Sequence, residues 1–394
     1  MVRDSRMQYY YLENKYIEWS LILGLFYFQF CPIPNITVRF ILLFLLLISA
    51  VFNQSFYQVN NIRCFIFIFL LTIFLSLYHG LTEAKNFFIF CFGILSASFF
   101  SRKYSFSGTI IYKYFIYVIV PLSILNHLLY HNVYYLSFTT GHVNIFGKDI
   151  TKHSTAIIGT LLFIGAVYNI LKNFKRIQLV DIIFIILGFY FVAFSEARSC
   201  LLALIGTIIL FIINMNKYKT NITIIYFIVM FVLVYFAEYV QNYVHLIDNE
   251  FILDLIGAKN FKTYGVTSGR EWLWNYHWDA FVDSPYLLGR GKDVTDFTVN
   301  DYLPSLRRKA PAGSESPFTG MLACYGIIAL FQFGILIFLS YKAIKKKNLL
   351  ATCIIFIAIY NGLMGVYFID VLQAYPILLY LLYFSSFYEN KVSS

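Results

Sequence analysis

Charged residues are scarce in this chain. Lys, Arg, Asp and Glu make up 13% of its 394 residues, whereas 60% are hydrophobic and the mean hydropathy is +0.70. In soluble domains about a quarter of the residues are normally charged, and such a domain cannot bury this much apolar surface. The scarcity of charge excludes a soluble globular protein and indicates an integral membrane protein.

Acidic residues are fewer than basic ones, 20 against 30, which leaves a net charge of +10. The charges lie between apolar runs rather than in one stripe, so the sequence does not indicate nucleic-acid binding. The acids nearest to apolar runs, such as Asp181, Glu238 and Asp370, lie near the ends of these runs. An ion-coupled transporter needs ionisable groups near the middle of the membrane, so this distribution disfavours that class.

Clustered cysteines are also missing, because none of the six forms a C-x-x-C pair or lies in a Cys/His cluster. Neither a zinc site nor a disulfide framework is expected, and the cysteines are interpreted as small packing residues. They are Cys31, Cys64, Cys91, Cys200, Cys324 and Cys353. The first apolar run lacks an A-x-A-like cleavage site, so we expect it to remain as a membrane span.

Long apolar runs are abundant and predict an all-α polytopic fold of about twelve transmembrane helices, since roughly 20 apolar residues cross a membrane. The expected spans are 16–34, 37–54, 63–80, 85–101, 108–128, 153–171, 177–195, 198–215, 221–243, 317–341, 349–366 and 370–388. Lys and Arg concentrate in alternate connections, most densely in "KAIKKK" at 342–347. The positive-inside rule then places both termini in the cytoplasm.

One long connection, 244–316, is predicted to lie outside the cytoplasm, within a single membrane domain spanning 1–394. It contains "SGREWLWNYHWDAFVD" at 268–283, which is typical of an amphipathic helix, followed by the turn sequence "SPYLLGRG". This loop is the only sizeable stretch of mixed polarity in the sequence, so we expect the chemistry there.

Two arginines are candidate anion ligands. Arg198 lies in the tight turn "FSEARSCLLALIG", where it either grips a phosphate or pairs with Glu196 or a lipid headgroup. Arg270 begins the loop helix, whose first backbone N–H groups favour an anion. Alternatively, Arg270 forms an exposed ion pair with Glu271 or Asp283 instead of binding an anion.

Weaker candidates follow in the same loop. Arg290 lies between Gly289 and Gly291, which form either a phosphate-binding nest or a simple turn. His277 and the neighbouring tryptophans either line a sugar site or form an interfacial aromatic belt, and the belt is favoured for most of them.

Glu315 directly precedes Ser316 and Pro317 at the start of an apolar run and follows the basic cluster "RRK" at 307–309, which includes Arg308. The acid is explained by a helix start, because a carboxylate complements the helix dipole. It is alternatively a catalytic group, although the dipole makes it a weaker base.

In their order and spacing, these motifs resemble the O-antigen polymerase and O-antigen ligase superfamily of bacterial inner-membrane glycosyltransferases. "SEARSCLLAL" resembles the Ser-Arg-small-Leu turn of these proteins, and "SGREWLWNYHWDAFVDSPYLLGRG" resembles the opening of their loop. The ligases carry a His followed by Asn, Ser or Gln, nine residues and Gly. Here Glu315-Ser316 is followed by nine residues and Gly326, so Glu replaces His, which is more typical of the polymerases.

The resemblance implies a GT-C-like fold and an inverting, metal- and cofactor-independent transfer of glycan from undecaprenyl diphosphate on the periplasmic face of the inner membrane. Arg198 and Arg270 would hold the diphosphate and Glu315 would act on the acceptor hydroxyl, with Arg290, His277 and Arg308 as further substrate-binding residues. Expected partners are the lipid-linked glycan as donor and acceptor, the lipid bilayer and a polysaccharide chain-length regulator, but no nucleic acid. No Asp-x-Asp motif occurs in the sequence.

Three other functions remain open. A ligase would transfer finished glycan to a lipid A core, a flippase or transporter would move lipid-linked glycan without bond formation, and a structural scaffold would do neither. The single large outer loop and the lack of cationic residues deep in the expected spans argue against the flippase or transporter.

Overall fold

A computed structural model describes residues 20–21, 24, 36–51, 59–103, 108–129, 152–172, 177–195, 198–214, 217–235, 270–291, 317–364 and 374–389. Throughout these ranges the regular elements are helices, and no strand is present. The predicted all-α class is thus confirmed for this part of the chain.

The chain divides into two compact units, which are described separately. One comprises Met1–Phe69, Ile89–Leu201 and Asp370–Ser394, and the other comprises Leu70–Phe88 and Leu202–Ile369. Helices α3 (Val59–His79), α4 (Leu81–Lys103) and α9 (Arg198–Asn214) each contribute residues to both units.

The first unit contains a close helical hairpin of α7 (Lys152–Lys172) and α8 (Leu179–Phe194). A Cβ placed on Gly159 would lie 2.6 Å from the carbonyl oxygen of Gly188, and the reverse substitution gives the same distance. Small residues let membrane helices approach at backbone distance, so these two glycines set the packing of the hairpin. The remaining helices of this unit are α2 (Ile36–Val51), α5 (Thr109–Tyr114), η2 (Phe115–Ile119), α6 (Val120–Leu129) and α20 (Ala374–Glu389).

A buried polar cluster connects three helices of the same unit. Asp181 of α8 is 4% exposed, and its Oδ1 accepts hydrogen bonds from Tyr112 Oη at 2.8 Å and from Asn169 Nδ2 at 3.1 Å. The Tyr112 ring also stacks on Phe184 with centroids 3.9 Å apart. A buried carboxylate needs such donors, so the cluster binds α5 and α7 to α8.

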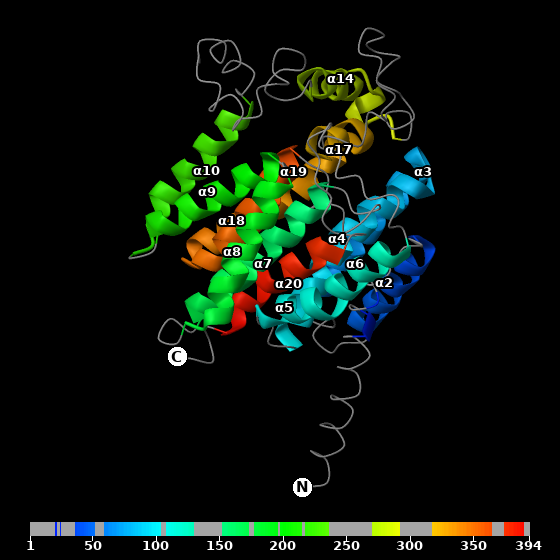
Figure 1. The fold of residues 1–394 in the computed structure, drawn as a ribbon. Helices are drawn as coiled ribbons and strands as arrows, with labels where there is room; N and C mark the ends of the chain where they lie inside the picture. Colours follow the sequence, from blue (N-terminus) through cyan, green and yellow to red (C-terminus); the bar gives the residue numbers. More distant parts are fainter. Residues whose placement is uncertain are drawn as a thin grey trace. The chain divides into compact units, whose positions relative to one another are not determined.

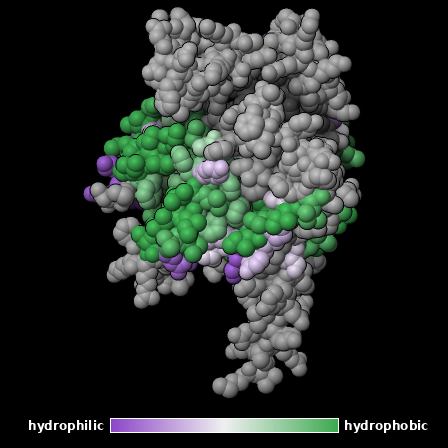
Figure 2. All heavy atoms as spheres, viewed as in Figure 1, coloured by the Kyte–Doolittle hydropathy of each residue, from purple (hydrophilic) through white to green (hydrophobic). Residues whose placement is uncertain are grey.

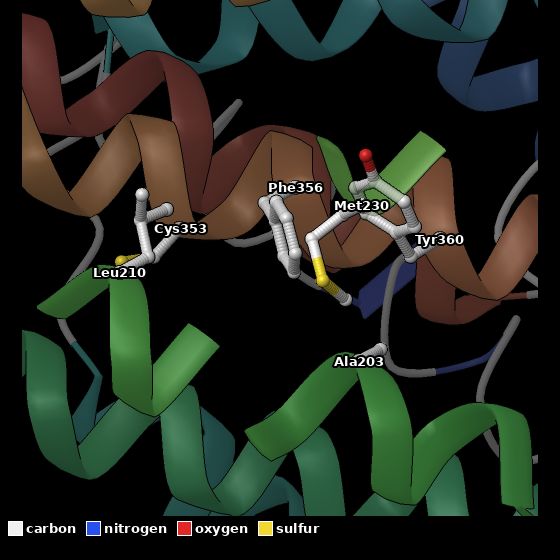
Figure 3. Close-up of a cluster of buried hydrophobic side chains, with 6 residues drawn as sticks. All are labelled: Ala203, Leu210, Met230, Cys353, Phe356 and Tyr360. Atoms are coloured by element: carbon white, nitrogen blue, oxygen red, sulfur yellow. The ribbon is translucent and has the colours of Figure 1, made fainter. Parts of the chain in front are cut away.

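The second unit packs α9 and α10 (Thr220–Tyr235) against α19 (Leu349–Met364). Figure 3 shows the six buried side chains at the centre of this packing: Ala203, Leu210, Met230, Cys353, Phe356 and Tyr360. Tyr360 donates a hydrogen bond to the backbone oxygen of Phe227, which ties α19 to α10. The other helices are α14 (Arg270–Val282), η5 (Pro285–Leu287), α17 (Pro317–Tyr325), η7 (Gly326–Ile328) and α18 (Ala329–Lys345).

The outer faces of the helices are apolar, as lipid contact requires. On α8, for example, Leu179, Ile183, Ile186 and Tyr190 are all exposed. Figure 2 shows a face on which hydrophobic side chains predominate among the described residues. Water-soluble proteins rarely expose apolar patches of this extent.

The observed helices follow the expected spans closely. From residue 37 onward each expected span coincides with a described helix or a continuous helical stretch, whereas the first, 16–34, lies largely outside the described residues. Thr155–Lys172 and Phe318–Lys345 are long and apolar enough to cross a membrane, and the other apolar helices are shorter. The number of spans, their orientation, the GT-C-like arrangement, the single domain and the external placement of 244–316 stay predictions.

Candidate active site around the loop helix and α17

The strongest predicted site residues lie at the starts of helices. Arg198 is the first residue of α9 and Arg270 is the first residue of α14, as the sequence indicates. Their side chains, together with Glu315 and Arg308, lie outside what the structure describes. α17 begins at Pro317, two residues after Glu315, so a helix does start where the sequence predicts one. The convergence of Arg198, Arg270 and Glu315 on one site stays a prediction.

The loop helix α14 packs directly on α17 (Figure 1). His277 of α14 has an exposed fraction of 0%, and its Nδ1 lies 2.9 Å from Oγ1 of Thr319 on α17. Trp278, the next residue of α14, is 56% exposed and contacts Phe281. In this structure His277 therefore joins two helices from a buried position, and among the α14 side chains that are described Trp278 is an aromatic residue that faces outward.

A tight turn follows α14 at residues 284–291. Ser284 Oγ donates to the Phe281 carbonyl at 2.6 Å and accepts from the Gly289 N–H at 3.0 Å, which closes the turn. Tyr286 and Leu287 adopt positive φ values of 53° and 56°. Such conformations cost about 1–3 kcal/mol in residues other than glycine and persist only where the surroundings hold them.

The surroundings that hold this turn are the backbone of α17 and the kink that follows it. The N–H groups of Arg290 and Gly291 donate to the carbonyls of Ala323 and Cys324 at 2.8 and 3.0 Å. Gly326, with φ +57°, begins the kink between α17 and α18, and a Cβ there would lie 2.1 Å from the Leu287 carbonyl oxygen. Glycine is therefore required at this position by contact as well as by backbone conformation.

The Gly-x-Gly motif is a docking turn in this structure. The three N–H groups of residues 289–291 already donate to protein acceptors, so they do not present the free anion nest that the sequence offered as one alternative. The Arg290 side chain donates from Nε to Ala280 O at 3.2 Å and from Nη2 to Asp283 O at 3.4 Å. It thereby satisfies carbonyls at the C-terminal end of α14, where a cation is favourable. A substrate contact by the exposed Arg290 side chain stays a prediction.

The sequence did not lead us to expect a role for His79, which contacts the turn. His79 is the last residue of α3, and its Nε2 lies 2.7 Å from the Leu288 carbonyl oxygen. A Cβ on Gly291 would lie 2.6 Å from its Nδ1. The available signal was the sequence "LYHG", in which a histidine ends an apolar run directly before a glycine. That signal does not reveal a partner 209 residues away.

Among the residues that the structure describes, no group of three or more His, Cys, Asp or Glu side chains lies close enough together to hold a metal ion. The polar groups that do converge are the backbone amides and carbonyls of the turn and α17, the His79 imidazole and the Arg290 guanidinium. This arrangement fixes the turn against α17, whose first residue lies two positions after Glu315 in the sequence.

Comparison with known protein families gives a match in the region that carries the candidate site. A family model described as O-antigen ligase matches residues 183–334, which include Arg198, Arg270, His277, Arg290 and Glu315. The comparisons with curated proteins and with solved structures find no match. The matched region contains α14, the docked turn and the α17–α18 kink. This match supports membership of the O-antigen ligase and polymerase superfamily for the region 183–334.

Proposed function

We propose that this protein polymerises lipid-linked oligosaccharide repeat units of a surface polysaccharide such as O-antigen, on the periplasmic face of the bacterial inner membrane. The observation that supports it best is the order of motifs within the matched region. Arg198 opens α9, Arg270 opens α14, the Gly-x-Gly turn docks on α17, and Glu315 precedes that same helix. The proposal includes a GT-C-like bundle of about twelve spans with both termini in the cytoplasm and the loop 244–316 outside.

The reaction is a single displacement at the anomeric carbon of the donor glycan. The terminal sugar hydroxyl of a new lipid-linked unit attacks this carbon, and a new glycosidic C–O bond forms as the bond to the lipid diphosphate breaks. The hydroxyl proton passes to Glu315, and undecaprenyl diphosphate leaves with the bonding electron pair. The configuration at the anomeric carbon inverts.

The charge that develops on the leaving diphosphate requires fixed cations. Arg198 and Arg270 are proposed to supply them, since the guanidinium fork binds phosphate oxygens through paired hydrogen bonds. These cations would take the place of a metal ion. Arg290 and Arg308 are the next candidates for contacts to the glycan or diphosphate. His277 supports the site indirectly in this proposal, because its ring is buried against α17.

The glutamate at position 315 favours a polymerase over a ligase, because the ligase pattern has a histidine there. A ligase would use the same donor and a lipid A core as acceptor. A flippase would move the lipid-linked glycan without forming a glycosidic bond. A chain-length regulator is the expected protein partner of the polymerase.

The test is polymerisation by the purified full chain in liposomes that contain lipid-linked repeat units, followed by separation of the products by length. We expect a ladder of products that is lost in Arg198→Ala and Glu315→Gln. Lys217→Ala, at an exposed cation of the predicted cytoplasmic side, serves as the control and should leave the ladder intact. Full ladders from folded Arg198→Ala and Glu315→Gln would refute the assigned roles. Glycan transfer only to lipid A core, or flipping alone, would establish the ligase or the flippase instead.

A further inference from the structure

We infer that His79 is a positioning residue that fixes the 284–291 turn against α17 and thereby sets the geometry of the proposed active site. This inference rests on the proposed function for its effect on the reaction. The contact itself is independent of that function, because it follows from the distances within one compact unit.

The hydrogen bond between His79 and the turn has a defined direction. A backbone carbonyl can only accept, so Nε2 of His79 carries the proton and donates to Leu288 O over 2.7 Å. Both the Nε2–H neutral tautomer and the imidazolium satisfy this requirement. The ring also fills the space over Gly291, where a Cβ would meet Nδ1 at 2.6 Å and the ring Cγ at 3.0 Å. His79 therefore holds the turn through both its donor and its ring volume.

The turn is the junction of three helices that lie far apart in the sequence. His79 attaches it to the end of α3, the Arg290 side chain attaches it to α14, and the amides of Arg290 and Gly291 attach it to α17. Gly80, with φ +92°, ends α3 directly after His79 and so keeps the histidine in the last turn of that helix.

This junction bears on the reaction through two helix starts. Arg270 opens α14, and Glu315 lies two residues before the start of α17. The turn and the contact between His277 and Thr319 together fix α14 relative to α17. Loss of the His79 contact releases one side of the turn, whose left-handed residues Tyr286 and Leu287 depend on external support. A small displacement of a reacting group is enough to lower the rate of a transfer reaction substantially.

The test compares His79→Ala, His79→Phe and His79→Gln in the full-length protein in lipid nanodiscs. Phe keeps the ring volume without a donor, whereas Gln keeps a donor. Leu77→Ala is the matched control, because Leu77 is 84% exposed on the same helix turn. Hydrogen exchange measured by mass spectrometry reports on the amides of Arg290 and Gly291, and polymerisation kinetics report kcat and KM for the donor.

We expect His79→Ala to accelerate exchange at residues 289–291 by about tenfold and to lower kcat by a similar factor, with KM changed by less than about twofold. His79→Gln, which keeps a donor, should restore much of both effects, whereas His79→Phe, which keeps only the ring volume, should restore little. Leu77→Ala should match the wild type. Unchanged exchange in His79→Ala, or full activity in His79→Phe, would overturn the inference. Faster exchange with unchanged kcat would overturn the positioning role while leaving the contact. If the wild type fails to polymerise, the proposed function fails, and the exchange data still decide whether His79 holds the turn.

Discussion

The carbonyl oxygen of Leu287 lies where a side chain on Gly326 would begin, because a Cβ at position 326 would be 2.1 Å from that oxygen. These two residues come from the loop turn and from the α17–α18 kink. Gly326, which ends the spacing motif that begins at Glu315-Ser316, is thus the residue on which the loop turn packs. The motif therefore connects Glu315, a candidate catalytic residue, in sequence to the glycine against which the loop turn packs. That this contact positions Glu315 stays a prediction.

Gly326→Ala should displace the 284–291 turn from the kink. The overlap with Leu287 O and with the backbone of residues 288 and 289 cannot be relieved by a rotamer change, so either the turn or the helix must move. We expect a loss of about 1–3 kcal/mol in stability and a large loss of polymerisation. Thermal unfolding in detergent measures the first and ladder formation the second.

Gly334→Ala provides the matched control on α18. No heavy atom outside the helix's own backbone, among the described residues, lies within 4 Å of a Cβ at Gly334, so alanine fits there without displacement. We expect equal or slightly higher stability, by up to about 1 kcal/mol, because alanine favours helix more than glycine does. A Gly326→Ala protein as stable and as active as Gly334→Ala would contradict the docking of the turn.

Gly291→Ala should act through His79. The new methyl group would overlap the imidazole, so the ring must withdraw and its hydrogen bond to Leu288 must lengthen. We expect the melting temperature to fall, and to fall by less when the same substitution is made in a His79→Ala background. A double-mutant cycle measures this coupling. Additive effects of the two substitutions would show that the ring and Gly291 do not touch in solution.

Thr319→Val should destabilise the contact between α14 and α17. Valine keeps the shape of threonine but removes the hydroxyl that lies 2.9 Å from the buried Nδ1 of His277. We expect a loss of about 1–3 kcal/mol in unfolding free energy, and Thr319→Ser, which keeps the hydroxyl, should be milder. The KM for the lipid-linked glycan should change little, since His277 is fully buried. A raised KM with unchanged stability would instead identify His277 as a substrate contact.

The apolar helices that the structure describes were predictable, because each coincides with a local run of apolar residues in the sequence. Even α14 was recognised, since "SGREWLWNYHWDAF" carries its own start signal and aromatic pattern. The sequence also indicated a turn at 284–291 from Pro285 and the two glycines.

What the turn contacts was not predictable in the same way. The bond from His79 to Leu288 spans 209 positions, and the amides of residues 290 and 291 find their acceptors on a helix that follows a long connection. The neighbouring sequence does not distinguish a glycine whose amide binds phosphate from a glycine that lets another backbone segment pack closely against it. The physical reason for Gly326 was therefore visible only in the structure, although its spacing from Glu315 was visible in the sequence.

Asp181 offers a test between an enzyme and an ion-coupled transporter. Asp181→Asn keeps an oxygen that can accept from Tyr112 and Asn169, so it should cost little stability, whereas Asp181→Leu leaves two buried donors without an acceptor and should cost about 2–5 kcal/mol. If the carboxylate only joins helices, Asp181→Asn should polymerise at the wild-type rate, because no step of the reaction uses its charge. A transporter driven by protonation of Asp181 would lose its coupling in the same variant. Melting temperatures together with ladder formation measure both outcomes, and loss of all activity in a stable Asp181→Asn protein would contradict a purely structural carboxylate.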